Sequence, residues 1–166
     1  MVNGKDEILE KEEPKIVDLF RHIDDRGILD QIFNSDLPFQ IKRIYTTISN
    51  KAVIRGMHGH QKEWKALYVS KGLIKIVVFP FDAINQKNSM NSNVVNFDEK
   101  LLRVFTLSDM KPQLLIVPSR HYHGYTSLDK ESRLIILSNL SLEETKKDDY
   151  RLDPKFFKKY FEVINR

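Results

Sequence analysis

The 166-residue chain has the length of one domain, and its 41% hydrophobic and 30% charged residues are typical of a globular protein. It contains no cysteine, which excludes disulfides, thiolate nucleophiles and zinc–thiolate sites. The net charge of +4 favours an anionic ligand. Because basic and acidic residues are mixed along the chain, we expect a small phosphorylated ligand and no nucleic acid.

The start of the chain carries charge where a targeting signal would be apolar. Residues 1–14 are predicted to form a charged arm, followed by a single domain over residues 15–166. No apolar run reaches the roughly 20 residues that a membrane span needs. We therefore expect a cytoplasmic protein that contacts no membrane.

From residue 15 onward, short β-type runs are separated by turn signals. The predicted strands cover residues 16–20, 28–33, 41–49, 65–70, 73–81, the second half of 96–107, 113–118, 121–127 and 133–140. A turn is predicted at 24–27, a hairpin across Lys71 and Gly72, and a polar loop at 85–93. Many short, regularly spaced strands predict an all-β sandwich, jelly roll or barrel.

The last residues follow a helical pattern. Asp153 is a suitable N-cap, and Pro154 fits the first helical position. One face of the predicted helix carries the apolar residues Phe156, Phe157, Tyr160, Phe161 and Ile164. We expect a short amphipathic helix at about 154–164 that packs on the β domain or on a partner subunit.

Four histidines form two His-x-His pairs, each beside a glycine. His58 and His60 make the first pair, and His121 and His123 make the second. On an extended chain, residues two positions apart face the same side. A single loop histidine usually has no function, but two such pairs indicate a site. Imidazole serves either as a metal ligand or as a proton carrier near neutral pH.

Cations lie on or beside the same predicted strands, which favours proton transfer. They are Lys42, Arg43, Arg55 and Lys65, and alternation places Arg43 on one strand face with Ile41, Tyr45 and Thr47. A base surrounded by cations suits a reaction through an enolate, because the cations stabilise the developing oxyanion. Cations also suit a pyrophosphate group.

Three motifs resemble the signatures of the dTDP-4-dehydrorhamnose 3,5-epimerases: DDRGIL (24–29), RGMH (55–58) and VPSRHYHGY (117–125). The resemblance implies that Arg55 contacts substrate and that His58 is the catalytic base. It also implies that Lys65 stabilises the enolate and that His123 lines the site. The strand at 133–140 lacks the Tyr that donates a proton in that family, and the C-terminal Asp that orients the base is expected to be missing.

Three other segments resemble the related sugar 3,4-ketoisomerases, the WxcM-like group: LPFQIKRIY (37–45), HGHQKEWKALYVSKG (58–72) and DDYRLDPKFF (148–157). That resemblance implies catalytic roles for His58, His60 and Tyr45. Lys65 stands where the ketoisomerases tend to have Gln, which is the epimerase pattern. Tyr45 and Tyr125 are the candidates for the missing proton donor.

Together the resemblances imply a cupin jelly-roll barrel, a homodimer, and an enzyme that acts on a nucleotide-linked 4-keto-6-deoxysugar without metal or cofactor. The charged arm and the C-terminal helix are the predicted dimer contacts. The predicted catalytic residues are His58, Lys65, Tyr45 and His60, and the predicted substrate-binding residues are Arg55, His123, Arg43 and Tyr125.

The first half-reaction is common to both enzyme groups: His58 removes the proton on carbon 3, and Lys65 and Arg55 hold the oxyanion on oxygen 4. Reprotonation of carbon 3 from the other face gives an epimer, and protonation of carbon 4 gives a 3-keto sugar. An epimerase-like reaction is the primary prediction and ketoisomerisation the alternative.

A cupin that only binds a small ligand, or that depends on a metal, is the remaining alternative. His58, His60 and His123 are three possible metal ligands. Glu63 follows His60 too closely to match the ligand spacing of metal-binding cupins, which leaves the fourth ligand without a candidate.

Overall fold

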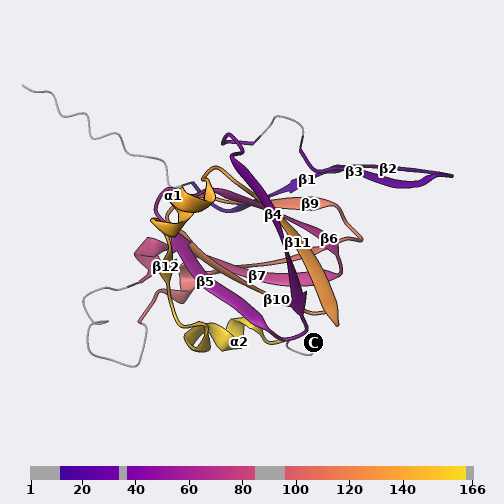
Figure 1. Ribbon diagram of the computed structural model, residues 1–166. Coiled ribbons are helices and arrows are strands. Elements are labelled where there is room, and N and C mark those ends of the chain that lie inside the picture. The colour runs from indigo at the N-terminus through magenta and orange to yellow at the C-terminus, as the bar shows by residue number, and fades with distance from the viewer. Residues whose placement is uncertain (1–11, 34–36, 85–95, 164–166) are drawn as a thin grey trace, which may run out of the picture.

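The protein, seen in a computed structural model that describes residues 12–33, 37–84 and 96–163, is built around two five-stranded antiparallel sheets (Figure 1). The first sheet has the strand order β1 (Lys15–Asp18), β9 (Gln113–Val117), β6 (Lys65–Lys71), β11 (Glu131–Ser138) and β4 (Arg43–Asn50). The second has the order β12 (Tyr150–Arg151), β5 (Ile54–His60), β10 (His121–Ser127), β7 (Leu73–Pro80) and β8 (Arg103–Ser108).

From β4 to β7 and again from β8 to β12, successive strands change sheet, which is the connectivity of a jelly roll. The predicted all-β jelly-roll fold with a short C-terminal helix is therefore confirmed. Short helical turns lie between strands: η1 (Phe81–Ala83), η3 (Glu99–Leu101) and α1 (Leu142–Lys146). The predicted polar loop at 85–93 and most of the predicted arm lie outside the described residues.

The predicted hairpin across Lys71 and Gly72 is wrong, because β6 and β7 lie in different sheets. Gly72 adopts a positive φ of 81°, which a glycine accepts readily, and the chain crosses there from one sheet to the other. Both strands already have two neighbours in their own sheets. Strand β6 lies between β9 and β11, and β7 lies between β10 and β8. A hairpin between them would displace these neighbours.

The observed elements differ from the predicted ones in several places. The run 16–20 is divided between β1 and β2 (Phe20–Asp24), and β2 pairs with β3 (Gly27–Gln31) across the predicted turn. Strand β5 was not among the predicted strands, because the glycines of RGMHGH interrupt its apolar pattern. Helix α1 and the two-residue strand β12 were also not predicted.

The packing of the core explains why the sequences of β6 and β7 are nearly continuous apolar runs. Their inward side chains form the layer between the sheets, with Leu67, Val69, Ile74, Ile76 and Val78 among its members. Their outward side chains are covered as well: those of β6 by the segment before β4, and those of β7 by the C-terminal residues. Burial on both faces removes the polar–apolar alternation of a half-exposed strand.

The C-terminal residues form two consecutive short helices, η4 (Pro154–Phe157) and α2 (Lys158–Phe161), rather than one helix to residue 164. The Asp153 side chain accepts a hydrogen bond from Lys155 N at 2.9 Å, as predicted for the N-cap. Phe157 and Phe161 are buried, and the Phe157 ring stacks on Phe79 of β7 at 5.0 Å between centroids. Among the described residues, no helix has the length and apolarity required to cross a membrane.

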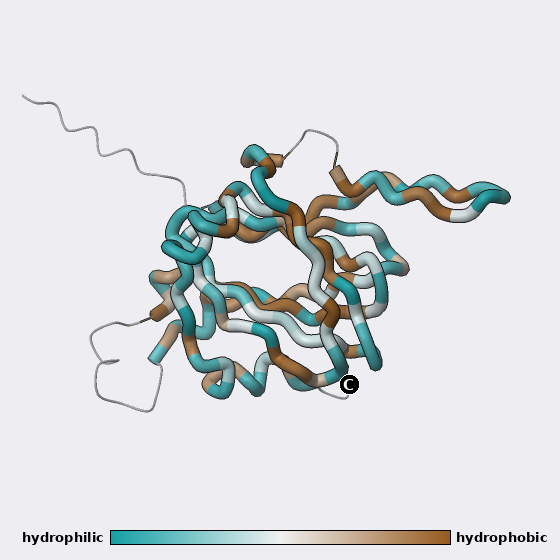
Figure 2. Tube along the Cα trace, in the orientation of Figure 1, coloured by the Kyte–Doolittle hydropathy of each residue, from teal (hydrophilic) through white to brown (hydrophobic). Residues whose placement is uncertain are grey.

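The homodimer stays a prediction, but the C-terminal helix is less suited to the contact than predicted. Phe157 and Phe161 are covered by their own chain and are therefore not available to a partner. The β2–β3 hairpin instead projects away from both sheets (Figure 1), and Figure 2 shows apolar residues along it. Its exposed side chains include Phe20, Ile23, Ile28 and Leu29, each more than half exposed.

Two neighbouring phenylalanines test the packing of the C-terminal helices. Phe157 is 0% exposed and Phe156 is 40% exposed. We expect Phe157→Ala to lower the free energy of unfolding by about 3–5 kcal/mol, because it leaves a cavity against Phe79. Phe156→Ala should cost less than about 1 kcal/mol. Urea unfolding measures both, and equal losses would contradict this packing.

Candidate active site

One cavity of about 520 Å³ is lined by residues of both sheets and of the segment from α1 to β12. All eight side chains predicted to form the site line this cavity: Arg43, Tyr45, Arg55, His58, His60, Lys65, His123 and Tyr125. Alternation places Arg43 and Tyr45 on one face of β4 and His58 and His60 on one face of β5. Arg55 and His58 both reach the cavity because the pairing of β5 with β10 shifts register between them. The chemical roles of all eight side chains stay predictions.

Three imidazoles gather where β5 and β10 pair. His123 lies opposite His58 in the register of the two strands, and the ring centroids are 6.3 Å apart. The His60 ring is 5.9 Å from His123. His121 is different: it does not line the cavity, and its Nδ1 lies 2.9 Å from the Ser119 carbonyl. Only one histidine of the second pair therefore belongs to the site.

Gly59 allows the two histidines of β5 to face the cavity. A Cβ at this position would lie 2.5 Å from the Tyr122 ring and 2.6 Å from the Phe81 ring, which is closer than real Cβ contacts. These aromatic rings pack directly on the outer side of β5, and the backbone between His58 and His60 is pressed against them.

His58 has a carboxylate beside it. Asp149 Oδ1 lies 3.6 Å from His58 Nδ1, and Arg151 Nη2 lies 2.7 Å from Asp149 Oδ2. The expectation that an orienting Asp is missing is therefore wrong for this chain. Burial lowers the pKa of His58 below its ordinary value, with the Lys65 charge adding to the effect and Asp149 opposing it. A neutral imidazole is the form that accepts a proton.

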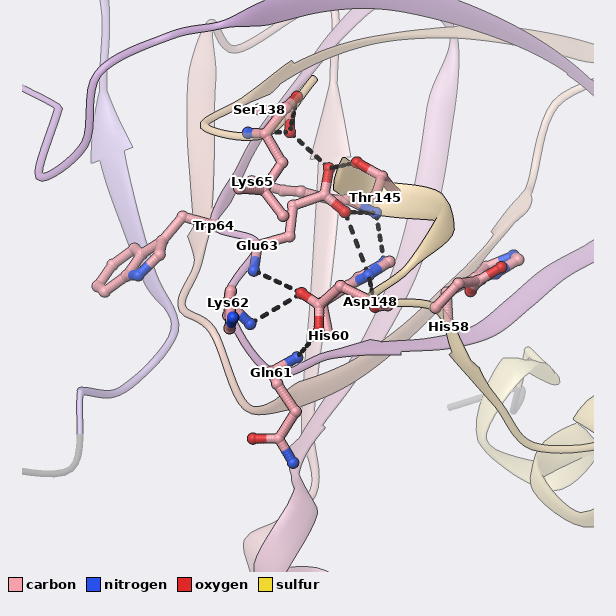
Figure 3. A network of polar contacts seen from close by, with 12 residues as sticks. His58, His60, Gln61, Lys62, Glu63, Trp64, Lys65, Ser138, Thr145 and Asp148 are labelled. Carbon is pink, nitrogen blue, oxygen red and sulfur yellow. Dashed lines mark hydrogen bonds and ion pairs between the residues drawn. The ribbon is translucent and has the colours of Figure 1, made fainter. Parts of the chain in front are cut away.

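Asp148, the preceding residue, holds His60. Its carbonyl oxygen lies 2.6 Å from His60 Nδ1, and its carboxylate accepts hydrogen bonds from the backbone N–H groups of Gln61, Lys62 and Glu63 at 2.8–3.1 Å (Figure 3). A carbonyl oxygen only accepts, so His60 Nδ1 must carry the hydrogen. His60 Nε2 is then free to accept a hydrogen bond.

The Lys65 amine supplies that bond at 2.9 Å from His60 Nε2. Both side chains are almost fully buried. Burial lowers the pKa of Lys65 and that of His60, so the charged form of each is disfavoured. The amine also stands in front of the ring nitrogen that a metal ion would need. Among the described residues, no three His, Asp or Glu side chains are arranged to hold a metal, so the site does not fit that alternative.

The other predicted cations, Lys42, Arg43 and Arg55, differ in whether they face the cavity and in their partners. Lys42 pairs with Glu144 at 2.9 Å on the surface and does not line the cavity. Arg43 points inward, where its Nη2 pairs with Glu63 at 2.9 Å and its guanidinium carbon lies 4.7 Å from the centre of the Tyr45 ring. Arg55 lines the cavity and is exposed. Arg55 therefore brings a solvent-exposed positive charge to the cavity.

The two predicted tyrosines, Tyr45 and Tyr125, also line the cavity. Burial raises the pKa of Tyr45 far above its ordinary value. The Tyr125 hydroxyl lies 3.0 Å from Thr47 Oγ1. Each phenol is therefore a potential proton donor that faces the cavity.

A family model described as "FdtA: WxcM-like, C-terminal" matches residues 12–162. The chain belongs to this family. The resemblance to the WxcM-like group that the sequence motifs indicated is thereby confirmed. No curated protein matches the sequence.

Solved structures of two kinds of enzyme share the fold. A 3,4-ketoisomerase from Helicobacter canadensis is 21% identical, with a TM-score of 0.66 over 89% of this chain and 97% of its own. A double mutant of the QdtA 3,4-ketoisomerase from Thermoanaerobacterium thermosaccharolyticum, in complex with TDP, is 22% identical, with a TM-score of 0.64 over 89% and 91%. The RmlC 3,5-epimerase from Legionella pneumophila is 19% identical, with a TM-score of 0.67 over 86% and 76%.

The segment from Leu142 to Arg151 contributes five lining residues that were not predicted: Leu142, Thr145, Lys146, Asp149 and Arg151. They contact strands some 90–100 residues earlier in the chain, and no local spacing rule connects the two regions. The only sequence signal was the resemblance of DDYRLDPKFF to the ketoisomerases, which includes Asp149 and Arg151.

The buried histidines make stability depend on pH. Burial lowers the pKa of His58, His60 and His123, that of His123 well below its ordinary 6.5. When the pH falls below about 6.5, the unfolded chain therefore binds protons that the folded chain excludes, and stability is lost. Each such histidine lowers the free energy of unfolding by at most about 1.4 kcal/mol for each unit that the pH falls.

We expect urea midpoints to fall between pH 7.5 and pH 5.5, and to fall less in His123→Gln than in the wild type. His22→Gln is the control, because the His22 side chain is 54% exposed. An identical fall in wild type and His123→Gln would contradict the neutral, buried state of His123.

Proposed function

We propose that this protein is a sugar 3,4-ketoisomerase that moves the keto group of a dTDP-linked 4-keto-6-deoxysugar from carbon 4 to carbon 3. The observation that carries the proposal is the contact between Lys65 and His60 beside a separate base, His58. Epimerisation needs proton transfer only at carbon. Ketoisomerisation also needs a proton delivered to oxygen 4 and one removed from oxygen 3, and a second proton-carrying pair suits that step.

The comparisons support this choice of reaction. The match covers 91–97% of the two ketoisomerase chains and 76% of the Legionella epimerase chain, so the present chain has the extent of the former. Ile136 is the residue of β11 that lines the cavity, and it cannot donate a proton. The primary prediction from sequence was an epimerase-like reaction. The geometry favours the alternative.

In the proposed reaction His58 removes the proton on carbon 3, and the electrons of that bond form the carbon 3–carbon 4 double bond. Lys65 protonates oxygen 4 to give an enediol. The hydroxyl on carbon 3 then returns a proton to Lys65 as the new carbonyl forms, and His58 delivers its proton to carbon 4. Both groups end in their starting state, so no cofactor takes part.

Binding is assigned to the groups at the cavity mouth. Arg55 is proposed to meet the pyrophosphate, and Arg151 and Lys146 line the same cavity. Arg43 and His123 are proposed to shape the sugar subsite, and Tyr45 and Tyr125 to contact its hydroxyl groups. The predicted homodimer and cytoplasmic location belong to the same proposal.

Incubation of the protein with dTDP-4-keto-6-deoxyglucose, followed by proton and carbon NMR, tests this function. We expect a 3-keto product. Inversion at carbon 3, or at carbons 3 and 5, would contradict the ketoisomerase assignment and restore the epimerase prediction. Failure to convert this sugar with dTDP, GDP, CDP or UDP attached would contradict the proposed class of reaction.

A further inference from the structure

Glu63 is a carboxylate without solvent exposure. It lies in the loop between β5 and β6, and its side chain is 0% exposed. Burying an ionised carboxylate is costly unless charged partners and hydrogen bonds compensate it. Three donors reach its Oε1 atom: Arg43 Nη2 at 2.9 Å, Thr145 Oγ1 at 3.2 Å and Ser138 Oγ at 2.5 Å.

The second oxygen of Glu63 has a different environment. Glu63 Oε2 makes no hydrogen bond with the described residues, although it is fully buried. It lies 3.2 Å from His60 Nδ1 and 3.5 Å from Lys65 Nζ. One oxygen therefore anchors the carboxylate, and the other directs negative charge at the Lys65–His60 pair (Figure 3).

The loop is built to keep Glu63 in this position. The Asp148 carboxylate accepts the backbone N–H of Glu63 and those of the two residues before it. Figure 3 shows Trp64 pointing away from the network, while Glu63 and Lys65 on either side of it point in. The spacing of Glu63 and Lys65 thus brings a carboxylate and an amine to the same imidazole.

We propose that Glu63 is a positioning residue whose carboxylate keeps one shared proton on the buried Lys65–His60 pair, with His60 carrying hydrogen on Nδ1 and Lys65 as the donor to substrate. Asp148 and Glu63 both place acceptors at His60 Nδ1, which leaves Nε2 as the acceptor for Lys65. The proton that the pair shares then stays on Lys65 Nζ and not on His60 Nε2.

The chemical use of this proton rests on the proposed function. A proton leaves Lys65 Nζ as the O–H bond forms on oxygen 4 of the sugar, and the hydroxyl on carbon 3 later returns one. Burial lowers the pKa of Lys65, and the Glu63 charge opposes that effect. Without Glu63, the proton equilibrium of Lys65 would shift toward the neutral amine.

Other charged or titratable groups also face the pair, and they come from every element around it. They are Arg43 on β4, His58 on β5, His123 on β10, and Asp148 and Asp149 before β12. Arg43 pairs with Glu63 itself, and Asp149 lies beside His58. Glu63 is the carboxylate that contacts both members of the pair.

Nitrogen NMR of the substrate-free protein tests the proposal. In wild type we expect His60 to carry hydrogen on Nδ1 and not on Nε2 between pH 6 and pH 8. In Glu63→Gln, the pair should lose its shared proton at a pH at least about one unit lower, a tenfold change in the proton equilibrium. Glu131→Gln, which removes an exposed carboxylate paired with Lys71, is the matched control and should shift nothing.

Turnover provides a second, separate readout. The basic limb of the kcat profile should move to lower pH in Glu63→Gln by the same amount, while KM changes by less than about threefold. Inactivity of the wild type on every 4-keto sugar would overturn the proposed function, and the NMR titration would still decide the role of Glu63. An active enzyme whose titration is unchanged in Glu63→Gln would overturn only the role of Glu63.

Lys65→Met covers the case in which Glu63→Gln does not fold. With the amine gone and the Glu63 charge in place, the His60 pKa should rise by at least about one unit. An unchanged His60 pKa, or wild-type His60 with its hydrogen on Nε2, would also overturn the proposal.

Discussion

Two consecutive aspartates hold the two histidines of β5, and the arrangement of the site depends on that contact. Asp148 fixes His60 through its carbonyl and the 61–63 loop through its carboxylate, and Asp149 lies beside His58. Strand β12 secures this register, since Tyr150 and Arg151 pair with Gly59 and His58. Without this segment, the histidines would lie on an edge strand with unfixed ring orientations, because β12 is the edge neighbour of β5.

The two histidines also differ in their exposure and in their partners. His58 is about a third exposed toward the cavity and has an exposed arginine behind its aspartate, which suits a base that meets substrate. His60 is almost fully buried and is contacted by an amine, a carbonyl and a carboxylate. A buried group of charges is weak evidence for stability, because apolar residues of similar volume often pack at lower cost. The proposed function gives this cost a purpose, because the cluster borders the cavity and is proposed to transfer protons.

Much of the fold follows from local pattern. Strands β6, β7, β9, β10 and β11 are continuous apolar or alternating runs, and the N-cap at Asp153 follows from one side chain and one proline. Part of the convergence at the site also follows from alternation, because His58 and His60 on β5 and Arg43 and Tyr45 on β4 each share a face. Strand propensity does not say which strands pair, so the crossing at Gly72 could not be predicted.

Long-range contacts account for the rest. The hydrogen bond between His60 and Asp148 joins residues 88 positions apart, and the pairing of Arg43 with Glu63 joins the start of β4 to the loop between β5 and β6. The sequence spacing of Glu63 bears only on metal binding. Its burial beside Lys65 depends on the long-range contact between its loop and Asp148, which local spacing does not reveal. Lys42 and Arg43 are adjacent in sequence and carry the same charge, but Lys42 precedes β4 and pairs with Glu144 on the surface, whereas Arg43 begins β4 and pairs with buried Glu63.

Exchange of the carbon 3 hydrogen of dTDP-4-keto-6-deoxyglucose with solvent deuterium, followed by NMR, tests most directly that His58 is the base. Wild type should incorporate deuterium at carbon 3, because enolate formation precedes every later step. His58→Ala should lose this exchange by at least about a hundredfold while still binding dTDP, since Arg55 and the cavity mouth remain. Exchange in His58→Ala at the wild-type rate, or no exchange in wild type, would contradict the account.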